Sequence, residues 1–116
     1  MKLKKFVLLF SASVVVLFFA SCSKSSSNPM TGANTTSVDI SGMAFPTTTT
    51  VKIGTTIVWN NKDATAHTVT SDDGSSFNSG NLASGASFSY QAKTVGSFPY
   101  HCNYHANMHG TLVVNP

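Results

Sequence analysis

Residues 96–110 read GSFPYHCNYHANMHG, and this stretch decides the fold that the sequence predicts. Apolar side chains alternate from Phe98 to Cys102, which is typical of a β-strand that buries one of its two faces. A second apolar run, at 112–114, follows the stretch almost at once. The sequence therefore predicts two β-strands joined by a short loop, and the loop is rich in His, Asn and sulfur-containing side chains.

Similar short apolar runs recur along the chain, separated by clusters of Gly, Asn, Asp, Ser and Thr. They lie at 38–40, 51–53, 57–59, 69, 88–90, 98–102 and 112–114. Seven Val and three Ile stand against two Leu after residue 35, and β-branched residues favour strands. No window carries the i, i+3, i+4 pattern of a helix. We therefore expect one all-β domain at 36–116, a β-sandwich or Greek-key barrel.

The N-terminal 21 residues are typical of a bacterial export signal. A basic segment, 1–5, precedes an apolar segment, 6–20, that is shorter than the roughly 20 residues needed to span a bilayer. The sequence Phe-Ala-Ser-Cys at 19–22 then resembles a lipobox, in which the cysteine is lipidated and becomes the new N-terminus. We expect residues 1–21 to be a lipoprotein signal peptide and Cys22 to anchor the exported protein to a membrane in the cell envelope or periplasm. The alternative is an ordinary signal peptide with a cysteine nearby.

Residues 22–35 are rich in Ser, Asn and Thr and have no periodicity, so we expect a flexible tether with a reach of roughly 20 Å. Export also changes the meaning of the two cysteines. If Cys22 is lipidated, Cys102 stays unpaired in an oxidising compartment, where structural thiols are usually in disulfides. Metal ligation would explain a free cysteine at that position.

The charge of the chain excludes one class of partner. Seven lysines, four aspartates and no arginine or glutamate give a net charge of +3, but three of the lysines lie among the first five residues. Without that segment, four lysines balance four aspartates. Proteins that bind nucleic acids need a basic surface that neutralises several phosphates. We therefore expect no nucleic-acid partner.

The loop after Cys102 contains the spacing C-x-x-H-x-x-M, with His105 and Met108, and another histidine, His67, lies 35 residues before the cysteine. One Cys, two His and one Met are the ligands of a blue-copper site, with a trigonal His₂Cys plane and a weak axial Met. Thiolate and thioether favour Cu(I), whereas imidazole binds both oxidation states. The residue types predict one type 1 copper ion.

Two further segments carry a resemblance to a known family. Residues 54–60 read GTTIVWN before the first histidine, and residues 96–102 lead into the loop. Over 36–116 the sequence resembles the cupredoxin family of blue copper proteins, most of all its plastocyanin- and amicyanin-like members. The resemblance implies a cupredoxin-like Greek-key fold. It also implies that the backbone N–H of Thr68 donates a hydrogen bond to the Cys102 sulfur. The copper ligands that it implies are His67, Cys102, His105 and Met108.

Two other histidines leave alternatives open. His101, His105 and His109 are spaced by four, which on a helix would line up a zinc-binding face. Strand alternation instead turns the His101 side chain away from the face that carries Cys102. We expect His109 at the surface beside the metal, although it could replace Met108 as the axial ligand.

The resemblance implies a blue-copper electron carrier that moves one electron between redox partners, such as cytochromes, through transient contacts. We expect a monomer and no enzymatic activity, because four protein ligands leave no position for a substrate. The alternative is an envelope protein that binds copper for storage or delivery. A third possibility is an adhesion module whose histidines and cysteine are fortuitous.

Overall fold

The computed structural model describes residues 34–116, which form seven strands and no helix. Accordingly, none of the described residues belongs to a helix long and apolar enough to cross a membrane. The expected signal peptide at 1–21, Cys22 and nearly all of the expected tether lie outside the described residues. The strands are β1 (Thr35–Ile40), β2 (Thr48–Lys52), β3 (Thr56–Asn61), β4 (Thr70–Ser71), β5 (Ser87–Gln91), β6 (Gly96–Cys102) and β7 (His105–Asn115).

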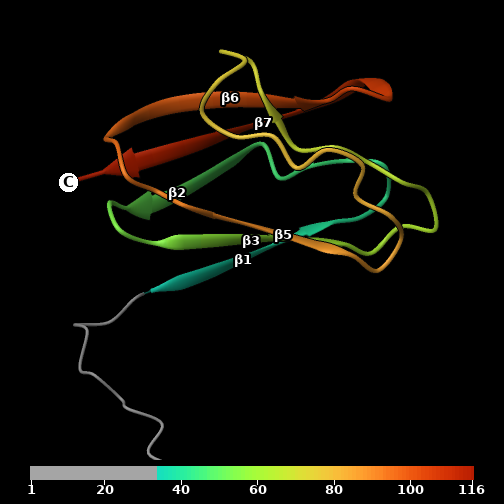
Figure 1. The fold of residues 1–116 in the computed structure, drawn as a ribbon, viewed down its shortest axis with the longest axis horizontal. Coiled ribbons are helices and arrows are strands. Elements are labelled where there is room, and N and C mark those ends of the chain that lie inside the picture. The colour runs from blue at the N-terminus through green and yellow to red at the C-terminus, as the bar shows by residue number, and fades with distance from the viewer. Residues whose placement is uncertain (1–33) are drawn as a thin grey trace, which may run out of the picture.

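The strands form two sheets packed face to face, which confirms the all-β sandwich (Figure 1). One sheet has the order β1-β3-β5 and the other the order β2-β7-β6-β4. The chain changes sheets at every connection from β1 to β6, and only β6 and β7 are successive strands that pair with each other. β1 is parallel to β3 and β2 is parallel to β7.

Each predicted apolar run coincides with a strand or adjoins one, but the last strand is longer than expected. β7 begins at His105, in the segment where the sequence predicted a loop. Residues 105–109 lack apolar alternation, so the strand is not visible in the sequence. Antiparallel pairing with β6 makes it a strand, and it buries Met108, Gly110, Leu112 and Val114.

Aromatic side chains link the two sheets in the core. Trp59 on β3 and Tyr100 on β6 are both fully buried. The indole N–H of Trp59 donates a hydrogen bond to the Tyr100 hydroxyl at 3.3 Å, and the rings meet edge-on with centroids 5.6 Å apart. Burial raises the pKa of Tyr100, which favours its neutral form as partner for the indole. Phe77 and Phe45 also pack against the Tyr100 ring.

Gly110 on β7 makes room for Tyr100, which lies directly opposite in the β6–β7 ladder. A Cβ atom at Gly110 would lie 2.6 Å from Cζ and 2.7 Å from the hydroxyl oxygen of Tyr100. It would also lie 3.0 Å from the carbonyl oxygen of Pro46, which limits escape to the other side. The contact between Trp59 and Tyr100, which joins the two sheets, therefore depends on the absence of a side chain at Gly110.

We predict that Gly110→Ala destabilises the protein. Replacing glycine by alanine within a strand by itself raises the stability of the fold by about 0.5–1 kcal/mol. Overpacking a closed core, however, lowers that stability by about 1–3 kcal/mol. The free energy of unfolding, measured by denaturant titration, should fall. The same substitution in a Tyr100→Phe background should cost less, because one clashing atom is gone. A Gly110→Ala variant as stable as the original protein would contradict this account of Tyr100.

Candidate metal centre

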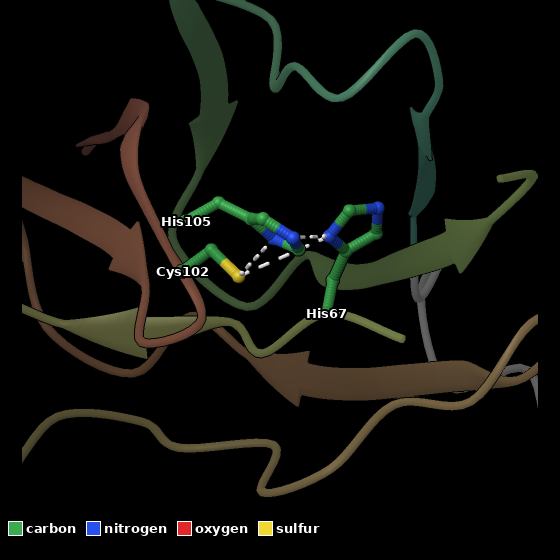
Figure 2. Close-up of side chains that lie close together, drawn as sticks. All are labelled: His67, Cys102 and His105. Atoms are coloured by element: carbon green, nitrogen blue, oxygen red, sulfur yellow. Dashed lines mark hydrogen bonds between the residues drawn. The ribbon is translucent and has the colours of Figure 1, made fainter. Parts of the chain in front are cut away.

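Three of the four predicted ligands meet in space (Figure 2). The Nδ1 atoms of His67 and His105 are 3.2 Å apart, and the Cys102 sulfur lies 3.9 Å and 3.5 Å from them, respectively. A trigonal ion with bonds of about 2.0–2.1 Å to nitrogen and about 2.3 Å to sulfur, values typical of zinc, would separate its donors by about 3.5–3.8 Å. The observed separations fit one ion bound by all three side chains.

A register shift in the β6–β7 ladder places Cys102 and His105 together. His101 pairs with His109, but the next residue, Cys102, pairs with His105 across a two-residue turn. The extra residues of β7 are thus accommodated on one side of the ladder, as in a β-bulge. Cys102 is 2% exposed and His105 is half-buried, so the thiol is shielded while the imidazole reaches the surface.

His67 comes from the connection between β3 and β4 and is fully buried. Its backbone N–H donates to the Leu82 carbonyl at 3.0 Å, and the Leu82 N–H donates back to the His67 carbonyl at 2.8 Å. This reciprocal pair fixes the backbone at His67 although no long strand contains it. The imidazole is therefore presented to Cys102 and His105 from a rigid position.

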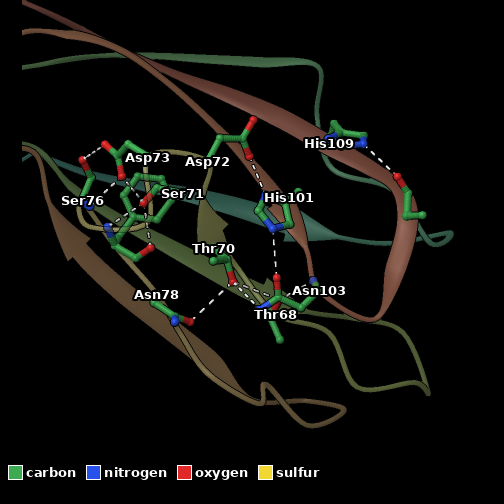
Figure 3. A network of polar contacts seen from close by, with 12 residues as sticks. Thr68, Thr70, Ser71, Asp72, Asp73, Ser76, Asn78, His101, Asn103 and His109 are labelled. Carbon is green, nitrogen blue, oxygen red and sulfur yellow. Dashed lines mark hydrogen bonds and ion pairs between the residues drawn. The ribbon is translucent and has the colours of Figure 1, made fainter.

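Thr68 connects the His67 segment to the loop that follows Cys102 (Figure 3). Its backbone N–H donates to the Cys102 sulfur at 3.4 Å, the contact that the family resemblance implied. Its hydroxyl oxygen accepts a hydrogen bond from the Asn103 N–H at 2.7 Å, a contact that the sequence did not predict. Thr70 also donates its hydroxyl to that oxygen, at 3.2 Å. One residue thus holds both the sulfur and the start of the loop.

Met108 is 2% exposed and lies in the same buried cluster as Cys102. Met108 is next to His109 on β7, and Cys102 is next to His101 on β6. The two histidines pair with each other across the ladder. Residues opposed across an antiparallel ladder point to the same face of the sheet. Met108 therefore faces the interior on the side of Cys102, although its ligand role stays a prediction.

The sequence did not identify Asp63, which contacts the other ring nitrogen of His67. The Asp63 Oδ2 atom is 2.9 Å from His67 Nε2, and the Asp63 side chain is 14% exposed. The pKa of Asp63 is lowered, first by the backbone N–H of Met43 and then by the hydrogen bond with His67. A carboxylate four residues before a histidine has no distinctive sequence signal when the intervening chain is a loop.

The three-histidine zinc alternative fails, because His105 and His109 lie on a strand, not on a helix. His101 points away from Cys102, as strand alternation predicted, and its two ring nitrogens contact Asp72 at 2.5 Å and Asn103 at 2.9 Å (Figure 3). The His101 and His109 ring centroids are 6.4 Å apart. Among residues 34–116, the side chains that bring three potential metal-binding atoms close together are those of His67, Cys102 and His105.

Comparison of the sequence with protein families supports the fold and the metal centre. A family described as the cupredoxin-like domain matches residues 10–114. The chain belongs to this family. No curated protein matches the chain in sequence. As a cupredoxin, the chain has a donor group with the composition and spacing of a type 1 copper site.

Solved structures of amicyanin resemble this cupredoxin. A reduced Cu(I) form of one amicyanin variant is 28% identical, with a TM-score of 0.64 over 70% of this chain and 82% of that chain. An oxidised form of another variant is 27% identical, with a TM-score of 0.65 over 72% and 85%. A Cu(I) form of a third variant is 27% identical, with a TM-score of 0.65 over 71% and 83%.

We predict that Thr68→Val lowers the stability of the copper-free protein. Valine keeps the shape of threonine but removes the oxygen that accepts the Asn103 N–H, and a hydrogen bond of this kind contributes about 0.5–1.5 kcal/mol. The free energy of unfolding measures the loss. Thr70→Val is the matched comparison, because it removes the hydroxyl that donates to the same Thr68 oxygen but leaves the Asn103 N–H bonded, so it should cost less. Equal losses in the two variants would contradict the role given to Thr68.

Proposed function

We propose that this cupredoxin is a blue-copper electron carrier. The Nδ1 atoms of His67 and His105 and the sulfur of Cys102 would bind one copper ion, with the Met108 sulfur as a weak axial ligand. The observation that carries the proposal is the convergence of the three donors at 3.2–3.9 Å. Copper bound there would supply the one-electron couple Cu(II)/Cu(I).

The fixed positions of the ligands support electron transfer. His67 is held by its backbone pair with Leu82, and Cys102 by the β6–β7 ladder and the Thr68 N–H. Ligands that cannot move hold one compromise geometry in both oxidation states, so little reorganisation accompanies the gain or loss of an electron. A site that holds its ligands in fixed positions is less suited to handing over its metal, which favours electron transfer over copper delivery.

Differences in burial suggest the path of the electron. His67 and Cys102 are buried, whereas His105 is half-buried at the start of β7. A redox partner, such as a cytochrome, would therefore exchange electrons through the exposed edge of His105. Small, transient interfaces are typical of such encounters. A monomer that presents one ligand edge to one partner at a time is sufficient for this role.

An enzymatic role is not part of the proposal. Three donors in a plane and an axial thioether would fill the coordination sphere, whereas catalytic metal sites keep one position open. The geometry thus fits a carrier that exchanges electrons without binding a substrate.

We further propose that the domain works in the bacterial cell envelope, attached by lipid at Cys22. The support is the sequence alone: a basic segment, an apolar segment and the lipobox-like residues 19–22. The stretch at 22–35 would tether the domain at 36–116 to the membrane. Such a tether would let the exposed edge of His105 sample partners within roughly 20 Å of the anchor.

We predict that the copper-loaded protein is intensely blue and that Cys102→Ser abolishes the colour, because the absorption is a thiolate-to-copper charge transfer. Met108→Leu is the matched comparison. It should keep the copper and the blue colour and raise the reduction potential, because loss of an axial donor disfavours Cu(II) more than Cu(I). Visible spectra and voltammetry provide the measurements. A colourless copper-loaded protein would refute the blue-copper proposal.

We predict that Cys22→Ser removes the membrane anchor without changing the copper spectrum. The variant should lack acyl mass and leave the membrane fraction, or remain uncleaved. Mass spectrometry of protein extracted from the producing bacterium checks both points. Unmodified original protein in the soluble envelope fraction would be evidence against the lipid anchor.

A further inference from the structure

Asp63 contacts the ring nitrogen of His67 that points away from the other donors. Figure 2 shows one nitrogen of His67 directed at His105 and the other turned away from Cys102 and His105. That second nitrogen, Nε2, is 2.9 Å from the Asp63 carboxylate. A carboxylate accepts hydrogen bonds, so Nε2 carries the proton and donates it. The neutral ring then has its lone pair on Nδ1, the atom that faces the donor group.

The Asp63 carboxylate also rests on two consecutive backbone N–H groups. Gly42 donates to Oδ1 at 2.8 Å, and Met43 donates to Oδ2 at 3.0 Å. Both residues are left-handed, with φ of 64° and 59°. Successive N–H groups in such a turn form a concave site for anions. Left-handed backbone is uncommon for methionine, and the carboxylate supplies a reason for it here.

The backbone of Asp63 is anchored as well. Its N–H donates to the Asn61 side-chain oxygen at 3.0 Å, and its carbonyl accepts the Ser84 hydroxyl at 2.6 Å. Asn61 is 1% exposed and donates its amide to the Leu82 carbonyl, which is also the backbone partner of His67. The carboxylate and the imidazole are therefore fixed to one network, and neither moves freely relative to the other.

We propose that Asp63 is a positioning residue of the metal centre: held by the Gly42–Met43 backbone, its carboxylate keeps His67 Nδ1 directed at the metal. The inference rests on the proposed copper site. Carboxylates behind a metal-binding histidine fix its tautomer and make it a stronger donor. A stronger donor with a negative charge behind it stabilises Cu(II) more than Cu(I). Asp63 therefore lowers the reduction potential and tightens Cu(II) binding.

The first test compares Asp63→Ala with Asp39→Ala in the full chain. Loss of a carboxylate behind a ligating histidine typically weakens metal binding 10–100-fold. We expect that weakening for Cu(II) in a chelator competition, together with a raised potential. In the copper-free protein, ¹⁵N NMR of His67 should lose its preference for the Nε2-protonated tautomer. Asp39 is an exposed carboxylate on β1, so its removal controls for the change of charge.

The second test alters the turn and leaves Asp63 and His67 untouched. The Met43 side chain is 42% exposed, so its replacement removes little packing. Glycine adopts positive φ readily, whereas β-branched valine does not. We expect Met43→Gly to match the original protein. Met43→Val should raise the potential and weaken Cu(II) binding, because it disturbs the N–H groups that hold the carboxylate.

The outcomes separate this inference from the proposed function. If Asp63→Ala matches Asp39→Ala in potential and affinity, and His67 keeps its tautomer, the positioning role is wrong. A loss of folding stability alone would also overturn it. If Asp63→Ala does not fold, identical potentials for Met43→Val and Met43→Gly would overturn it. A colourless original protein would refute the blue-copper site, and the copper-free His67 tautomer would still decide the role of Asp63.

Discussion

The pairing of β6 with β7 is the constraint on which the metal centre depends. The two strands remain in register as far as His101 and His109, and the ladder then shifts so that Cys102 pairs with His105. A regular ladder would have set Cys102 opposite Met108 and carried His105 beyond reach of the thiol. Because of this shift, the buried end of β6 and the half-buried start of β7 each supply one donor to the same point. The third donor then needs only a fixed position opposite them.

That position comes from the connection between β3 and β4, which crosses from one sheet to the other, and the core determines how the two sheets meet. Trp59 in one sheet contacts Tyr100 in the other, two residues before Cys102. The missing side chain of Gly110 lets the Tyr100 ring come close to β7. The distance between sheets is thus set beside the metal centre, and the Thr68 contacts with Cys102 and Asn103 close the remaining gap.

The sequence predicted the strands and the donors because both leave local signals. Apolar alternation gave the seven strands, and the spacing of Cys102, His105 and Met108 suggested their common chemistry. The sequence did not reveal the early start of β7, because that part of the strand forms only through pairing with β6. Nor could it reveal the roles of Gly110 and Asp63. The need for glycine arises only when Tyr100 lies opposite, and Asp63 acquires its partners only when separate turns meet.

The supports of the donors are unequal, and the inequality suits electron exchange. His67 is fully buried and bound on two sides, by Leu82 through its backbone and by Asp63 through its ring. His105 is half-buried and lies at the end of a two-residue turn. A centre held rigidly from inside keeps its geometry when its charge changes. Because His105 is the one proposed ligand that reaches the surface, the proposed electron transfer would not require the site to open to water.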